Sequence, residues 1–131
     1  MKDKFRMTKT EAPSLNGFIK DLGYPCENHE YATKDGYINS IIRIPGTKEV
    51  GAEPHVAGGK PVVIYQHGLM DCCAGIIADG EDSLGFQLVN KGFDLWLPNS
   101  RGNRYSREHM KSDDVPYYNV SKDADYWEFS F

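Results

Sequence analysis

The first apolar pattern along the chain predicts a short amphipathic helix between residues 13 and 23. Its apolar side chains follow helical spacing and would share one face: Leu15, Phe18, Ile19 and Leu22. Ser14 can cap the start of this helix, and Gly23 can adopt the left-handed conformation that often follows a helix end. We therefore expect a small helix that packs its apolar face on the rest of the domain.

Two β-prone segments follow and predict a hairpin. They cover residues 29–33 and 37–44 and flank Lys34-Asp35-Gly36. Asp-Gly between two such segments is a strong signal for a tight turn. Residues 45–60 are rich in Pro and Gly and are interpreted as a surface loop.

A nearly continuous apolar run over residues 61–66, from Pro61 to Gln66, predicts a third strand. Such a run is typical of a buried strand that is covered on both faces. The run breaks at His67-Gly68, and the turn there could present the backbone N–H of Leu69 to a negatively charged oxygen. Gly68 permits backbone angles that leave this N–H pointing into a cleft.

Residues 83–91 predict a second helix, because Asp82 or Ser83 can cap its start and Gly92 can follow its end. A fourth strand is expected at residues 93–98. Strand, helix and strand with short connections favour a right-handed parallel crossover. The fold class is therefore α/β, with a β-hairpin followed by a parallel β-α-β unit.

The carboxyl ends of the third and fourth strands should lie side by side, because parallel strands end at one edge of a sheet and sites form there. His67-Gly68-Leu69 follows the third strand, and Asn99-Ser100-Arg101-Gly102-Asn103 follows the fourth. We expect the two loops to be neighbours. The His67 ring is expected to hold its turn through hydrogen bonds to backbone, rather than to act as a general base.

Composition narrows the possible partners. A net charge of −4 gives no reason to expect nucleic acid, and no apolar run approaches the length of a membrane span. The histidines and cysteines lack the spacing of a metal site, and no cofactor motif occurs. No signal peptide is visible, and the sequence does not indicate a compartment.

The three cysteines are Cys26, Cys72 and Cys73, an odd number that allows no complete disulfide framework. Cys72 and Cys73 adjoin the turn that carries Leu69, and a thiolate would be a competent nucleophile there. No base that could pair with either thiol is identifiable. We interpret them as two small, semi-buried thiols.

Several short motifs occur in order along the chain. Those of the first half are Gly23-Tyr24-Pro25, Thr33-Lys34-Asp35-Gly36-Tyr37-Ile38 and Arg43-Ile44-Pro45. Those of the second half are the run that ends in His67-Gly68-Leu69, then Ser83-Leu84-Gly85-Phe86, Gly92-Phe93-Asp94-Leu95-Trp96, Asn99-Ser100-Arg101-Gly102-Asn103 and Tyr126-Trp127-Glu128-Phe129-Ser130-Phe131. Together these motifs resemble the acid lipase family, of the gastric and lysosomal type, from about residue 15 to the last residue.

The resemblance implies the N-terminal portion of an α/β-hydrolase fold with an incomplete sheet. Residues 1–12 would be a flexible N-terminus, 13–60 the lipase-associated region, and 61–131 the first β-α-β part of the core, truncated before the nucleophile elbow. The family hydrolyses lipid carboxylic esters through Ser, His and Asp. Only the oxyanion N–H of Leu69, with the turn residues His67 and Gly68, carries over, because Gly-x-Ser-x-Gly is absent.

Three interpretations stay open. The first is the N-terminal part of a lipid ester hydrolase that is inactive alone, and the second is a non-catalytic subunit whose half-fold a partner chain completes. The third is a small-molecule or lipid-binding module. The family's strand order would leave residues 61–66 as an open sheet edge, where another protein chain could pair.

Overall fold

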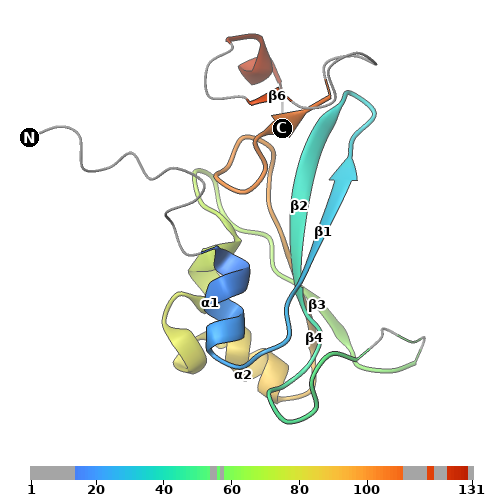
Figure 1. Ribbon diagram of the computed structural model, residues 1–131, viewed down its shortest axis with the longest axis vertical. Coiled ribbons are helices and arrows are strands. Elements are labelled where there is room, and N and C mark those ends of the chain that lie inside the picture. The colour runs from blue at the N-terminus through green and yellow to red at the C-terminus, as the bar shows by residue number, and fades with distance from the viewer. Residues whose placement is uncertain (1–13, 54–55, 57, 111–117, 120–123, 130–131) are drawn as a thin grey trace, which may run out of the picture.

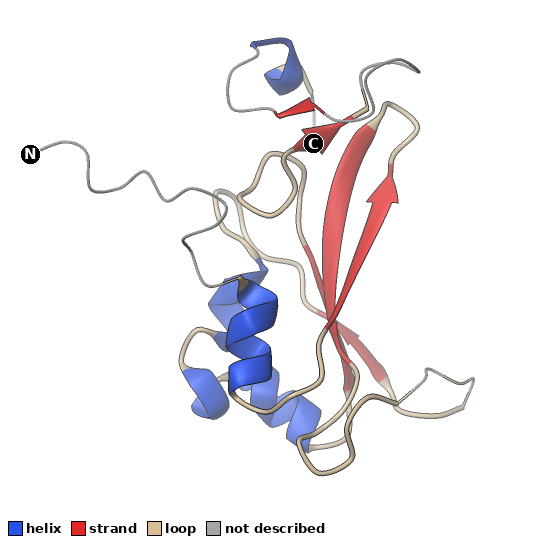
Figure 2. Cartoon of the chain, in the orientation of Figure 1, coloured by secondary structure: helices blue, strands red, loops and turns tan. Residues whose placement is uncertain are grey.

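The computed structural model describes residues 14–53, 56, 58–110, 118–119 and 124–129, and the structural statements below refer to these residues. A mixed β-sheet carries two α-helices on one of its sides (Figures 1 and 2). The expected α/β class is therefore confirmed. The predicted flexible segment 1–12 lies outside the described residues.

The sheet is organised around its longest strand, β2 (Tyr37–Ile44). One edge of β2 pairs with the antiparallel strand β1 (Glu27–Ala32), and the other pairs with β4 (Asp94–Pro98) and then β5 (Glu108–His109). The strand β3 (Val62–Ile64) is parallel to β4, and β6 (Tyr118–Asn119) is antiparallel to β5. The two short strands β5 and β6 were not predicted from the sequence.

Both predicted α-helices form, and their ends follow the expected residues. In α1 (Leu15–Asp21) the Ser14 Oγ accepts the Gly17 N–H at 3.0 Å, and Gly23 follows with a φ of 88°. The helix α2 (Leu84–Asn90) precedes β4, and Gly92 follows it with a φ of 90°. Three short 3₁₀ helices complete the described elements: η1 (Cys73–Ile77), η2 (Gly80–Asp82) and η4 (Ala124–Trp127).

The main core lies between the helices and the sheet (Figure 1). Its buried side chains come from α1, η1, α2, β2 and β4, and they include Ile19, Ile77, Phe86, Ile44 and Leu95. From β2 the alternate residues Ile42 and Ile44 face this core, because side chains alternate between the two faces of a strand. The core therefore fixes β4, and with it the loop that follows β4.

The opposite face of the sheet carries a buried ion pair. The guanidinium of Arg43 donates from Nε and Nη2 to the two carboxylate oxygens of Asp94, both at 2.9 Å, and its Nη1 lies 3.1 Å from Glu27. The Arg43 and Asp94 side chains are 8% and 1% exposed. Because the three residues belong to β2, β4 and β1, the pair ties three strands together.

The prediction that the third strand is covered on both faces is wrong. Only Val62–Ile64 form a strand, and the side chains of Val62 and Ile64 are 45% and 69% exposed. In the described part of the chain β3 pairs with β4 alone and stands at the edge of the sheet. An apolar sequence allows a strand to be buried, but burial also requires another segment that covers it. Among the described residues, no segment covers the face of β3 that carries Val62 and Ile64.

Candidate active site

The turn after β3 exposes its tip to solvent. Leu69 and Met70 are 83% and 99% exposed, and Gly68 is exposed as well. Among the described residues, no acceptor receives the N–H of Leu69. The left-handed backbone conformation in this turn belongs to Met70, whose φ is 60°. A Cβ atom at position 68 would meet nothing within 4 Å, so the turn shape does not depend on this glycine.

The buried ring of His67 forms the base of the turn. Its Nδ1 lies 2.8 Å from the carbonyl oxygen of Gly68, and its Nε2 accepts the backbone N–H of Ser100 at 3.1 Å. A carbonyl oxygen can only accept and a backbone N–H can only donate, so the ring proton is on Nδ1. The expected bonding of His67 to backbone is confirmed, and so is the expected contact between the loops that follow β3 and β4.

The far end of the turn is held by Asn99, the first residue after β4. Its Oδ1 accepts the N–H of Cys73 at 3.1 Å, and its Nδ2 donates to the Cys73 Sγ at 3.2 Å. Asn99 and Cys73 are both fully buried. These two bonds join the start of η1 to the end of β4.

The buried thiol of Cys73 is a poor nucleophile. Desolvation raises its pKa to about 12, so the thiolate that attack requires is scarce at neutral pH. Burial also raises the pKa of Cys26, to about 11. All three cysteines are free, and Cys72 is only partly buried. The interpretation as a semi-buried thiol therefore holds for Cys72, whereas Cys73 is fully buried.

Two further polar side chains, His109 and Arg101, bond to the hairpin turn between β1 and β2. The Nε2 of His109 lies 2.8 Å from the Asp35 carbonyl oxygen, in the hairpin turn. Arg101 forms an ion pair with Asp35 at 2.6 Å and stacks on the Tyr37 ring at 4.5 Å. Within the described ranges, no three His, Cys, Asp or Glu side chains gather as a metal site would need, and no helix is long and apolar enough to cross a membrane.

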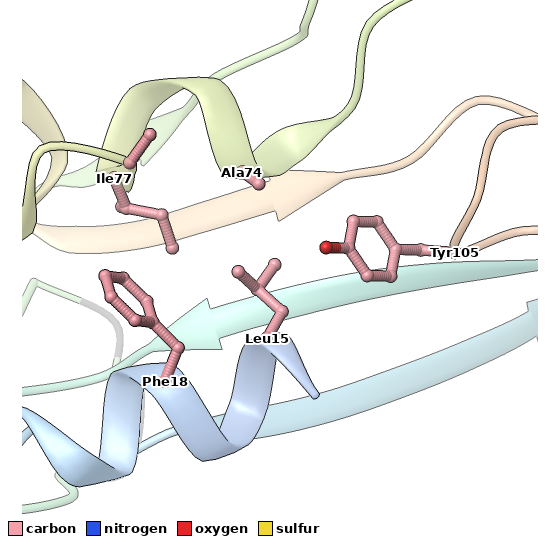
Figure 3. A pocket seen from close by; sticks show the side chains of 6 residues that line it. Leu15, Phe18, Ala74, Ile77 and Tyr105 are labelled. Carbon is pink, nitrogen blue, oxygen red and sulfur yellow. The ribbon is translucent and has the colours of Figure 1, made fainter. Parts of the chain in front are cut away.

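A shallow, open pocket of about 210 Å³ lies between α1 and η1 (Figure 3). Its lining is apolar apart from the hydroxyl of Tyr105, and it consists of Leu15, Phe18, Ala74, Ile77, Ala78 and Tyr105. None of the turn residues 67–69 contributes to it. The pocket therefore does not place a ligand at the Leu69 N–H.

Comparison with known proteins agrees with the geometry of this α/β unit. Residues 15–79 match the family model described as the partial alpha/beta-hydrolase lipase region. Human lipase member M is 42% identical over 120 residues, and bovine gastric triacylglycerol lipase is 38% identical over 129 residues. A putative lysosomal acid lipase/cholesteryl ester hydrolase of Crotalus adamanteus is 39% identical over 123 residues. The chain belongs to the acid lipase family.

These matches cover most of the chain but only a small part of each relative. They include 90%, 96% and 92% of the chain, and 26%, 30% and 28% of the three acid lipase relatives. The chain thus spans a quarter to a third of the length of those relatives.

The structure adds two residues to the site predicted from the sequence. Asn99 and Asn103 bond to both ends of the turn, whereas sequence reasoning treated them only as part of a neighbouring loop. A signal was available, because a short amide side chain directly after an apolar strand often satisfies backbone groups of an adjacent loop. The partners themselves lie 26 and 36 residues away along the chain.

Proposed function

We propose that these residues form the oxyanion-binding part of a lipid ester hydrolase of the acid lipase family. The Leu69 N–H is the donor, and it stabilises the negative oxygen that develops when the ester carbonyl is attacked. The observation that carries the proposal is an exposed N–H, without an acceptor in the described residues, at the carboxyl end of a strand of the sheet. One such donor contributes about 2.7–4 kcal/mol to catalysis.

The nucleophile is proposed to come from residues other than these 131. Gly-x-Ser-x-Gly does not occur in the sequence, and Cys73 holds its proton too tightly to replace a serine. The buried Ser106 is engaged as well, because its hydroxyl donates to the Asn99 carbonyl oxygen and accepts the Ser40 N–H. By themselves the 131 residues are therefore expected to be inactive. The substrate class is lipid carboxylic esters, in line with the names of the relatives.

The test is a chimera in which residues 1–131 replace the matching part of bovine gastric triacylglycerol lipase. Leu69→Pro removes the N–H, whereas Leu69→Ala removes the same side chain and keeps the N–H. We expect kcat for a triacylglycerol to be about 10²–10³-fold lower in L69P than in L69A. Equal rates in two folded variants would refute the oxyanion role, and hydrolysis or fluorophosphonate labelling of the 131-residue chain alone would refute the missing nucleophile.

The edge of β3 is the proposed attachment site for the strand that brings the nucleophile. The Pro61 carbonyl and the Tyr65 N–H bond to β4, so the backbone groups of Val62 and Ile64 point away from β4. The added strand could belong to the same polypeptide or to a partner chain, and the second case is the non-catalytic subunit. In the chimera, Ile64→Pro should abolish hydrolysis and Ile64→Thr should retain it. If both variants were equally active, the edge would not be the attachment site.

A further inference from the structure

The turn between β3 and η1 is held at its two ends, while its tip is open. His67 and Cys73 are 8% and 0% exposed, and residues 68–71 between them are all exposed. Met70 adopts a left-handed conformation, which is unfavourable for a residue with a side chain. Such a conformation persists only where the surrounding structure imposes it. The restraint must therefore come from the two buried ends.

Both ends are bonded to a single segment, residues 99–103. At one end the Ser100 N–H and the Nδ2 of Asn103 lie 3.1 Å and 3.2 Å from the Nε2 of His67. At the other end the Oδ1 of Asn99 accepts the Cys73 N–H. The two asparagines are also joined, because Asn103 Nδ2 donates to Asn99 Oδ1 at 2.8 Å. The segment is thus a clamp that closes on both ends of one turn.

The clamp is anchored to the central strand of the sheet. The Asn99 N–H donates to the Ser40 carbonyl oxygen at 3.0 Å. The Ser106 hydroxyl donates to the Asn99 carbonyl oxygen at 3.2 Å and accepts the Ser40 N–H at 3.0 Å. All three residues are buried. The position of Asn99 is therefore set by β2, which pairs with three other strands.

The His67 ring connects the clamp to the peptide group between Gly68 and Leu69. Because Nε2 accepts hydrogen bonds from the clamp, the ring proton is on Nδ1 and bonds to the Gly68 carbonyl oxygen at 2.8 Å. The peptide between residues 68 and 69 is trans and planar, so its C=O and N–H point in opposite directions. Drawing the carbonyl oxygen toward the ring directs the Leu69 N–H away from it.

We propose that Asn99 and Asn103 are positioning residues that, together with the Ser100 N–H, hold the His67 ring with its proton on Nδ1 and thereby aim the Leu69 N–H. This inference rests on the proposed function, in which that N–H stabilises an oxyanion. Neither asparagine touches the reacting atoms. They act through the ring of His67 and through the Cys73 end of the turn.

The first test is ¹⁵N NMR of the His67 ring and of the Leu69 amide in the 131-residue chain at neutral pH. We expect the proton on Nδ1 in the wild type, and a proton on Nε2 as well in Asn103→Asp, because a carboxylate there accepts instead of donating while the Gly68 carbonyl oxygen keeps its bond to Nδ1. The order parameter of the Leu69 N–H should fall in the same variant. Asn90→Asp is the matched control, since the Asn90 Oδ1 only accepts the Tyr24 hydroxyl, which a carboxylate also does.

The second test is amide hydrogen exchange in Asn99→Ala. We expect the Cys73 N–H to exchange about tenfold faster relative to the core amides of β2, because one buried hydrogen bond is lost. A wild-type ring protonated on Nε2 would overturn the proposal, and this measurement needs no variant. Unchanged His67 and Leu69 signals in a folded N103D chain would overturn it too. Since these readouts do not involve hydrolysis, they can succeed even if the L69P and L69A chimeras prove equally active, which would refute only the oxyanion role.

Discussion

The substitution Asp94→Asn should destabilise the fold strongly. It removes the charge that neutralises Arg43, and it turns an acceptor oxygen into an NH₂ group that faces the guanidinium. Both hydrogen bonds of the pair are 2.9 Å long, and both side chains are almost fully buried. Breaking a buried pair by removing one partner costs about 3–5 kcal/mol, because the other charge is left without compensation.

The structure favours the lower end of this range. Glu27 stays 3.1 Å from Arg43, and its side chain is 35% exposed, so it offers a partly screened second counter-charge. We therefore expect about 3 kcal/mol. With an m value of about 2 kcal/mol/M, the urea midpoint would fall by about 1.5 M. Trp96 is a suitable fluorescent probe, because the Arg43 guanidinium lies 5.2 Å from the centre of its ring.

Asp35→Asn is the matched control, since Asp35 also pairs with an arginine but its side chain is 55% exposed. Its midpoint should stay close to that of the wild type, because exposed pairs contribute little. The double variant Arg43→Met/Asp94→Asn should lose less stability than the sum of its single variants, because no buried charge remains. A loss below about 1 kcal/mol in D94N, or strict additivity in this cycle, would refute the reasoning.

Three further predictions concern stability. Gly85→Ala should destabilise the fold by about 1–3 kcal/mol, because the new Cβ would lie 2.5 Å from the Ile77 side chain and this clash outweighs the better helix propensity of Ala. Gly68→Ala is the control: its Cβ meets nothing within 4 Å, so the urea midpoint should not change. Ser83→Ala should be neutral or stabilising, because the buried Ser83 Oγ has no hydrogen-bond partner among the described residues. Ser14→Ala should cost about 1 kcal/mol, because it loses the cap of α1. Thermal unfolding of the two variants measures this difference. Partial burial raises the pKa of Glu27, but hydrogen bonds from His29 and Arg43 outweigh it and hold the pKa below its usual range. The stabilisation that ionised Glu27 gives the fold is therefore complete above its unfolded pKa of about 4.3, and it is lost as the pH falls through its lower folded pKa. If a Glu27→Gln chain had the same acid unfolding curve as the wild type, Glu27 would not contribute in this way.

Local signals in the sequence were enough to predict the helices and the long strands. Ser14 and Gly23 bracket α1 as expected, and the Asp-Gly turn lies between β1 and β2. These features depend on residues a few positions apart, which a pattern can report. The exposure of Ile64 could not be predicted in this way, because it depends on what covers the strand and not on the strand itself.

The site was predictable only in outline. The position of the turn and its contact with the loop after β4 followed from the end of an apolar strand. The left-handed conformation of Met70 was not predicted, because residues with a side chain other than Asn or Asp rarely adopt it. The bonds from Asn99 and Asn103 were missed because hydrogen bonds between side chains and distant backbone leave no periodic trace in a sequence.

The separation of Arg43 and Asp94 along the chain has a consequence for the order of folding during synthesis. The helix α1 and the hairpin of β1 and β2 are made first, and Asp94 follows Arg43 only 51 residues later. Until then Arg43 has only the partly exposed Glu27 as a counter-charge, so water must remain around the guanidinium on that face of the hairpin. Loss of that water, docking of β4 and closure of the core over α2 therefore belong to one concerted step. On a ribosome paused before residue 94, the hairpin would be formed while the Arg43 guanidinium was still hydrated.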